Sequence, residues 1–189
     1  MADGDDLINR YVVLLRGINV GGHNKVPMAA LREKLSDRGF DDVTTYIASG
    51  NVLLDAGDRR ESEVVDDVAD AVAERFGFSI PVVARPVADW PGILAANPFP
   101  DAEAEPKLLH ISLCDRPPEP DTIAAFDVEA YLPDRLEIIG RELYLWYPNG
   151  SGRSKLTGAV LERALGVTTT ARNWSTMLKL AELAQRPAT

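Results

Sequence analysis

Cysteine is almost missing from this 189-residue sequence, and histidine is scarce. The single cysteine, Cys114, excludes an internal disulfide and any metal site built from several cysteines. It lies in an apolar run, so we expect a small buried side chain. The two histidines, His23 and His110, have no carboxylates at metal-ligand spacing, and we expect His110 to be packed within a strand. The sequence therefore predicts no metal site and no cofactor.

Long apolar runs are also missing. No run approaches the roughly 18 residues that a membrane-spanning helix needs. The first six residues, MADGDD, are acidic and polar, whereas a signal peptide starts with basic residues and continues into an apolar core. Apolar residues still make up 46% of the chain, which suits a globular protein. We expect a cytoplasmic protein that does not associate with membranes.

Positive charge is in deficit, because the formal net charge is −9. Nucleic-acid binding needs clustered lysine and arginine, so this balance makes nucleic acid the least favoured partner. Two segments nevertheless carry more basic than acidic residues. Residues 7–32 contain no acid and four bases, and residues 151–189 contain six bases and two acids. If the fold brings them together, these segments would form one anion-binding surface.

The hydrophobic pattern of the first half predicts six elements. Apolar and β-branched runs bounded by turn residues indicate strands, and apolar residues at helical spacing indicate helices. The expected order is strand 11–15, a helix from Pro27 to Gly39, strands 43–47 and 52–54, helix 60–76 and an edge strand 80–84. This is the β-α-β-β-α-β order of the ferredoxin-like fold.

The same order recurs in the second half. The expected elements are strand 108–114, helix 122–126, strands 136–139 and 143–146, helix 156–165, strand 167–170 and a final helix 174–184. We therefore predict an α+β protein with two tandem ferredoxin-like halves and a C-terminal helix. The predicted boundaries are a mobile tail at 1–9, a first subdomain at 10–86, a connector at 87–106 and a second subdomain at 107–189.

Two glycine-rich loops carry polar residues. Residues 16–25, RGINVGGHNK, follow the first strand, and residues 149–155, NGSGRSK, precede a helix that Ser151 or Ser154 could cap. Glycines let backbone N–H groups approach an anion, and the cations of each loop would supply charge. The alternative for both loops is plain turn formation and helix capping. Neither matches a dinucleotide-binding or phosphate-loop motif.

A third polar segment, residues 168–174, TTTARNW, precedes the last helix. Asn173 or Ser175 could cap that helix, while Arg172 would lie near its positive end. A cation there is disfavoured unless it meets an anion, which is a mild indication of function. No serine lies in a nucleophile elbow, because residues 47–51 read IASGN rather than G-x-S-x-G. No residue stands out as a nucleophile or general base, so no reaction is predicted.

Several of these segments together resemble a known family. LLRGINVGG at 14–22, KVPM at 25–28, YIASGNV at 46–52 and TARNW at 170–174 resemble the bacterial family catalogued as domain of unknown function 1697. The resemblance implies a two-part ferredoxin-like fold and implies no activity. The positions that match its signature are Arg16, Gly17, Asn19, Gly21, Gly22, Asn24, Lys25, Ser49, Gly50, Asn51, Ser154, Lys155, Arg172, Asn173 and Trp174.

The leading hypothesis is a small anionic ligand, such as a nucleotide or phosphorylated metabolite, bound between the two halves. Its charge would be held by Arg16, Lys25, Lys155 and Arg172, and it would be oriented by Asn19, Asn51 and Asn173. The remaining candidate contacts are Gly21, Gly22, Ser49 and Ser154. The alternative is a protein-interaction module in which the same residues are structural and fix the junction between the halves. Whether the protein is an enzyme, and its oligomeric state, are left open.

Overall fold

The computed structural model describes residues 9–185, so the predicted tail lies almost entirely outside the described residues. The chain divides into two compact units. Within the described range, unit 1 comprises residues 9–91 and 180–185, and unit 2 comprises Gly92–Lys179. No helix within 9–185 has the length and apolar character needed to cross a membrane.

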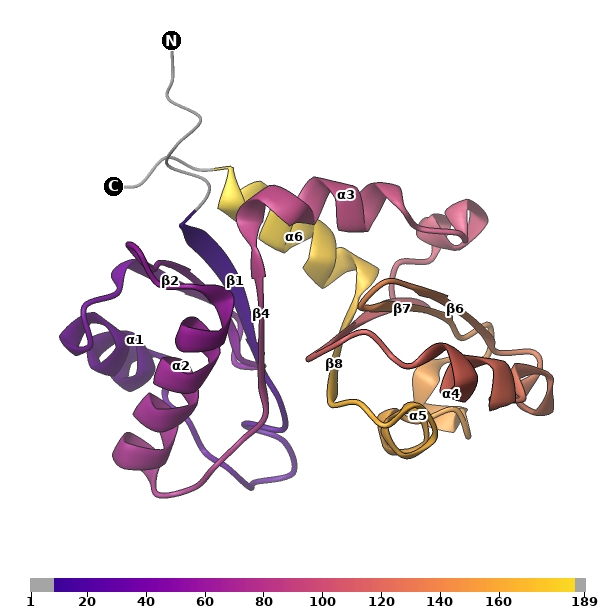
Figure 1. The fold of residues 1–189 in the computed structure, drawn as a ribbon, viewed down its shortest axis with the longest axis horizontal. Helices are drawn as coiled ribbons and strands as arrows, with labels where there is room; N and C mark the ends of the chain where they lie inside the picture. Colours follow the sequence, from indigo (N-terminus) through magenta and orange to yellow (C-terminus); the bar gives the residue numbers. More distant parts are fainter. Residues whose placement is uncertain (1–8, 186–189) are drawn as a thin grey trace, which may run out of the picture. The chain divides into compact units, whose positions relative to one another are not determined.

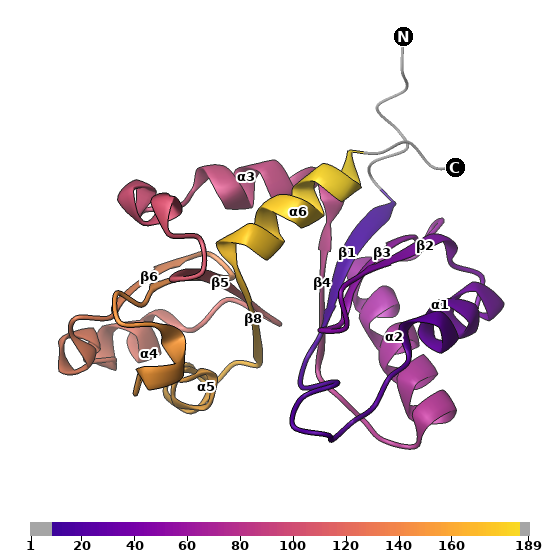
Figure 2. The same cartoon turned by 180° about the vertical axis from the view of Figure 1, so that it is seen from behind.

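Unit 1 has the predicted β-α-β-β-α-β order. Its elements are β1 (Arg10–Leu15), α1 (Met28–Asp37), β2 (Asp41–Tyr46), β3 (Asn51–Asp55), α2 (Glu61–Phe76) and β4 (Val82–Pro86). The four strands form an antiparallel sheet in the order β2-β3-β1-β4, with β4 at an edge as expected. Helices α1 and α2 lie side by side on one face of this sheet (Figures 1 and 2).

The core of unit 1 follows from the two periodicities of its sequence. Alternate residues of β1, including Val13 and Leu15, face the helices. Helix α1 presents Leu31 and Leu35 to them, and α2 contributes the stripe Val64, Val68 and Val72. Burying a leucine or valine side chain stabilises the fold by roughly 1.5–3 kcal/mol. These side chains therefore fix how the helices lie on the sheet.

The segment that follows unit 1's sheet consists of short helices. It contains η1 (Val87–Asp89), α3 (Trp90–Ala95) and η2 (Pro100–Ala104). All three short helices lie within the predicted connector, residues 87–106. The division between the two units falls within α3 and, near the C-terminus, within α6 (Trp174–Ala184).

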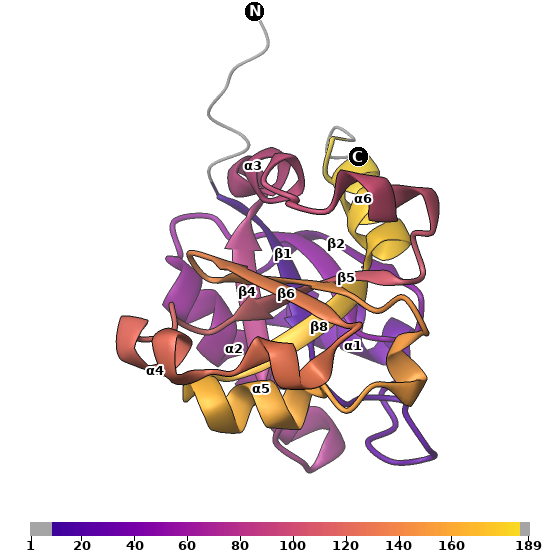
Figure 3. The same ribbon diagram turned by 90° about the vertical axis from the view of Figure 1, so that its right-hand side faces the viewer.

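Unit 2 repeats the arrangement. Its elements are β5 (Leu109–Cys114), α4 (Pro120–Ala125), η3 (Val128–Tyr131), β6 (Arg135–Ile139), β7 (Glu142–Trp146), η4 (Ser151–Arg153), α5 (Gly158–Leu165), β8 (Thr169–Asn173) and the start of α6. The sheet order is β6-β7-β5-β8, which corresponds strand for strand to that of unit 1. Helices α4 and α5 lie on the same side of this sheet (Figure 3). The predicted fold class, two tandem ferredoxin-like halves with a C-terminal helix, is confirmed.

The core of unit 2 lies between its sheet and α5. Leu143 and Leu145 of β7 pack in one cluster with Leu161 and Leu165 of α5. Cys114 belongs to the same cluster and is fully buried, as its apolar surroundings in the sequence indicated.

Several elements begin or end at other residues than the sequence predicted, among them β2, β4 and α4. Two further differences concern the candidate site residues. Helix α5 begins at Gly158, and its N-cap is Thr157, whose side chain accepts a hydrogen bond from the Val160 N–H. Ser151 and Ser154 therefore do not cap it. Strand β8 covers Thr169–Asn173 rather than 167–170, because its ladder with β5 extends from Thr169 to Asn173. Arg172 and Asn173 thus belong to a strand.

Candidate functional site

The first glycine-rich loop, residues 16–27 between β1 and α1, is closed by the side chain of Asn19. The Asn19 amide nitrogen donates to the carbonyls of Val26, at 3.0 Å, and Ala48, at 2.7 Å. The Asn19 amide oxygen accepts from the Val26 N–H at 2.9 Å. Since Ala48 lies in the β2–β3 turn, one side chain joins two loops. Asn19 therefore pairs with the chain's own backbone rather than facing a ligand with free groups.

A second asparagine strengthens the same loop. The Asn24 amide donates to the Gly17 carbonyl at 3.1 Å, and the Asn24 carbonyl accepts from the Asn19 N–H. Both asparagines have positive φ, 54° for Asn19 and 47° for Asn24, a region that asparagine tolerates better than most residues. Gly21, Gly22 and Lys25 of this loop are exposed. Lys25 forms no ion pair with any residue that the structure describes.

The β2–β3 turn is equally constrained. Asn51 is fully buried, and its amide donates to the Tyr46 carbonyl at 2.9 Å and to the Ser49 hydroxyl at 3.0 Å. Gly50 has φ +82°, and a Cβ at this position would lie 2.8 Å from Leu15 Cβ. Only glycine fits there. The sequence candidates Ser49 and Asn51 thus shape the turn that Asn19 holds from the other side.

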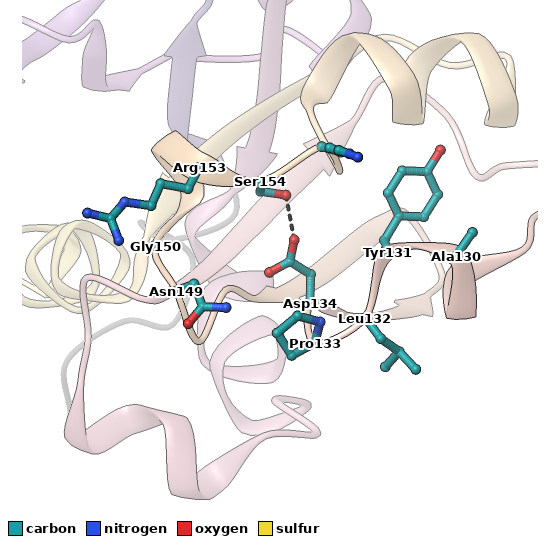
Figure 4. A pocket seen from close by; sticks show the side chains of 10 residues that line it. Ala130, Tyr131, Leu132, Pro133, Asp134, Asn149, Gly150, Arg153 and Ser154 are labelled. Carbon is teal, nitrogen blue, oxygen red and sulfur yellow. Dashed lines mark hydrogen bonds between the residues drawn. The ribbon is translucent and has the colours of Figure 1, made fainter.

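In unit 2, the second glycine-rich loop borders a pocket of about 230 Å³ (Figure 4). One wall comes from the segment that joins η3 to β6, and the other from the loop between β7 and α5. The lining residues are Ala130, Tyr131, Leu132, Pro133, Asp134, Asn149, Gly150, Arg153, Ser154 and Lys155. Two sequence candidates, Ser154 and Lys155, therefore meet in one cavity. The volume lies just below the roughly 300–1,000 Å³ of typical small-molecule pockets, so it suits a small ligand.

A short hydrogen-bonded chain fixes one wall of this pocket. The Ser154 hydroxyl donates to Asp134 Oδ2 at 2.6 Å, as Figure 4 shows, and accepts from the Leu156 N–H at 2.8 Å. Asp134 is only 7% exposed. The Tyr147 hydroxyl donates to the Leu156 carbonyl at 3.1 Å, and burial, with a smaller contribution from Asp134, raises the pKa of Tyr147 to about 12. Ser154 is therefore a positioned hydroxyl that holds a carboxylate in place.

The cations of the pocket are exposed. Neither Arg153 nor Lys155 forms an ion pair with any residue in the described range. In Figure 4 the Arg153 guanidinium extends away from the Ser154–Asp134 pair. Asn149 is exposed on the same lining. The pocket thus combines two cations that have no counter-ion among the described residues with one carboxylate that Ser154 holds by a hydrogen bond.

Arg172 and Asn173 do not line this pocket. Arg172 donates through Nη1 to the Thr170 hydroxyl at 3.1 Å and to the Ala171 carbonyl at 2.8 Å. Burial lowers the pKa of Arg172 to about 10, so it is still a cation at neutral pH. The Asn173 side chain accepts from the Thr176 N–H at 2.9 Å and caps α6, which is one of the two caps that the sequence predicted.

His110 is packed as the sequence indicated. Its ring lies edge-on to the Tyr147 ring at a centroid distance of 5.3 Å, and burial lowers the pKa of His110. Within residues 9–185, no group of three or more histidine, cysteine, aspartate or glutamate side chains could hold a metal ion.

Sequence reasoning missed Asp134, the most buried charged residue of the pocket. Nothing in the sequence distinguishes it from the other acids. It reaches Ser154, twenty positions away, only because β6 and β7 form a hairpin between them. A hydrogen bond of that sequence separation leaves no local signal.

Comparison with known proteins places the chain in a family. A family model described as a protein of unknown function, DUF1697, matches residues 8–144. The chain belongs to this family. The resemblance stated from the motifs is therefore confirmed. The matched range ends before the loop at 149–155, so DUF1697 membership does not itself cover Arg153, Ser154 and Lys155.

A solved structure shares the fold. The conserved bacterial protein SP0830 from Streptococcus pneumoniae superposes with a TM-score of 0.72 at 23% identity, covering 93% of this chain and 98% of that one. At this identity the likeness concerns the fold. No curated protein matches the sequence.

Proposed function

We propose that unit 2 binds a small anionic ligand, of the class of phosphorylated metabolites, in the pocket beside residues 149–155. One observation carries the proposal: Arg153 and Lys155 both line this cavity, and neither pairs with a carboxylate of the described residues. Charge-assisted hydrogen bonds from such cations to phosphate oxygens are roughly twice as strong as neutral ones. A phosphate between them would supply the counter-charge that no residue in the range 9–185 provides.

The pocket includes only some of the ligand-binding residues that the sequence suggested. Ser154 and Lys155 contribute to it, whereas Arg16, Lys25 and Arg172 are not among its lining residues. Their part in ligand binding stays a prediction, as does the cytoplasmic location. No step of chemistry is proposed, because the Ser154 hydroxyl is already committed to Asp134 and to the Leu156 N–H.

The test is thermal stabilisation by a panel of nucleotides, sugar phosphates, coenzyme A, inorganic phosphate and sulfate at fixed pH and ionic strength. A ligand at about 100 times its Kd adds roughly 2.7 kcal/mol of stability, which raises the Tm of a protein of this size by several degrees. We expect a phosphorylated compound to give this shift.

Two variants test the assignment to this pocket. Lys155→Ala and Arg153→Ala should each weaken binding about 10-fold or more, because each removes a charge-assisted contact. Arg163→Ala is the matched control, since Arg163 is an exposed arginine of the same unit that does not line the pocket. Stabilisation that survives both pocket variants would place the ligand elsewhere.

The alternative, a protein-interaction module with structural signature residues, is favoured by a separate observation. The side chains of Asn19, Asn51 and Asn173 all bond to the chain's own backbone. No thermal shift with any compound of the panel would favour that alternative for the pocket loop as well.

A further inference from the structure

Asp134 places a carboxylate in a pocket whose other charged side chains, Arg153 and Lys155, are positive. A site for a simple anion gains nothing from such a group, because a carboxylate repels phosphate and sulfate. Asp134 is also not a chance surface acid, since its side chain is almost completely buried. Its presence in the lining therefore needs an explanation of its own.

The carboxylate is positioned and still has capacity to accept. Asp134 Oδ2 accepts from Ser154 at 2.6 Å. Asp134 Oδ1 accepts no hydrogen bond from any residue in the range 9–185. The buried side-chain nitrogen and oxygen atoms of that range that have no hydrogen-bond partner are Arg10 Nε and His110 Nδ1, so Asp134 Oδ1 is accessible to solvent. An accessible carboxylate oxygen beside an oriented one is an acceptor for a donor that enters the pocket.

The surrounding charges indicate which donor fits. An ammonium group would share the cavity with the two cations, whereas a hydroxyl group adds no positive charge. Ser154 and Asp134 come from opposite walls of the pocket, and the Arg153 guanidinium extends away from them (Figure 4). The acceptor and the arginine thus occupy different parts of one cavity.

We infer that the ligand carries hydroxyl groups beside its phosphate, as a sugar phosphate does, and that Asp134 accepts a hydrogen bond from one of them. This rests on the proposed anion site and specifies its ligand. The phosphate contacts Arg153 and Lys155, while the carboxylate selects for the sugar portion. The volume of about 230 Å³ suits a phosphorylated sugar rather than a dinucleotide.

The first experiment compares two ligands on the unaltered protein by calorimetric titration. Ribose 5-phosphate and butyl phosphate carry the same phosphate, but only the first has hydroxyl groups. We expect ribose 5-phosphate to bind at least 10-fold tighter, the difference that one hydrogen bond to a charged group makes. Equal affinities would overturn the inference while leaving the anion site in place. No binding of either ligand would overturn both.

Phosphoethanolamine serves as the third ligand, because it presents an ammonium group in place of hydroxyls. We expect it to bind more weakly than ribose 5-phosphate. Tighter binding of phosphoethanolamine would show that Asp134 pairs with an ammonium, and the inference would fail.

Two variants connect the selectivity to Asp134. In Asp134→Asn the amide oxygen can still accept from Ser154, but the charge is lost. The affinity ratio between ribose 5-phosphate and butyl phosphate should fall about 10-fold, through weaker binding of the sugar and tighter binding of butyl phosphate. An unchanged ratio in a folded variant would overturn the inference.

Ser154→Ala provides a second route if Asp134→Asn does not fold. It removes the hydroxyl that orients the carboxylate, so it should reduce the same ratio by a few-fold. A ratio that stays at the level of the unaltered protein would show that the positioned carboxylate has no part in selectivity. Circular dichroism at the assay temperature establishes that each variant is folded.

Discussion

The two glycine-rich loops look alike in sequence and differ in what their side chains do. In the loop at 16–27, Asn19 and Asn24 use their amides on backbone groups of the loop and its neighbouring turn. In the loop at 149–155, Ser154 bonds to a distant acid, and Arg153 and Lys155 have no ion pair among the described residues. Loops of similar composition can therefore differ in whether their polar side chains bond to the loop's own backbone or remain available to a ligand. We call the loop at 16–27 closed and the loop at 149–155 open in this sense.

The largest expected effect concerns the closed loop. Gly50→Ala would place a Cβ 2.8 Å from Leu15 Cβ and 2.9 Å from Ile18 Cδ1, at a φ of +82°. We expect the free energy of unfolding to fall by about 2–4 kcal/mol, from overpacking added to left-handed strain. Urea denaturation measures it. Gly57→Ala is the control. Gly57 also has a positive φ, +57°, but an added Cβ would meet nothing within 4 Å apart from its chain neighbours, so this change should cost about 1 kcal/mol. Equal losses would show that the close approach of Leu15 does not matter.

The second prediction sets one asparagine against another. Asn19→Ala removes three hydrogen bonds and places alanine at a φ of 54°, so we expect a loss of roughly 2–3 kcal/mol. Asn149→Ala, in the open loop, removes an exposed side chain and should change stability by less than about 0.5 kcal/mol. Similar losses for both in urea denaturation would remove the distinction between the loops.

The smallest effect concerns the hydrogen bond from the Tyr147 hydroxyl to the Leu156 carbonyl, next to the open loop. Tyr147→Phe removes the hydrogen bond to the Leu156 carbonyl and should cost about 1 kcal/mol at pH 8. The folded protein raises the pKa of Tyr147 from 10 to about 12, so the native state retains this proton longer than the unfolded chain. Stability should therefore decline as pH rises from 10 to 12. The decline should be shallower in Tyr147→Phe, and an equal slope in both proteins would contradict the assignment.

Local patterns predicted most of the fold. Helix α6 spans the expected residues 174–184, and α2 begins one residue after the expected start, because their apolar stripes repeat at helical spacing. The predicted bounds of β8, residues 167–170, were wrong, since the limits of this strand depend on its pairing with β5 rather than on its own sequence. The start of α5 was predicted too early, because Ser151, Ser154 and Thr157 are all suitable N-cap residues and the sequence does not distinguish them. Ser154 bonds to Asp134 instead, and Thr157 is the N-cap.

The candidate site was less predictable than the fold. The polar loops could be located from glycine, asparagine and basic residues. The sequence could not show which loop is closed and which is open. That difference depends on the hydrogen bonds from Asn19 to Ala48 and from Ser154 to Asp134, which join residues 29 and 20 positions apart. Residue type sets which hydrogen bonds are possible, and the tertiary fold decides which are made.

The amide of Asn19 has a consequence for the order in which unit 1 folds. It joins residues 19 and 48, and these come together only when β1 and β3 have paired. We expect this bond to form after that pairing, so that Asn19→Ala should change the unfolding rate more than the folding rate. Interactions made after the transition state mainly slow unfolding. We therefore expect this one side chain to lengthen the lifetime of the native sheet.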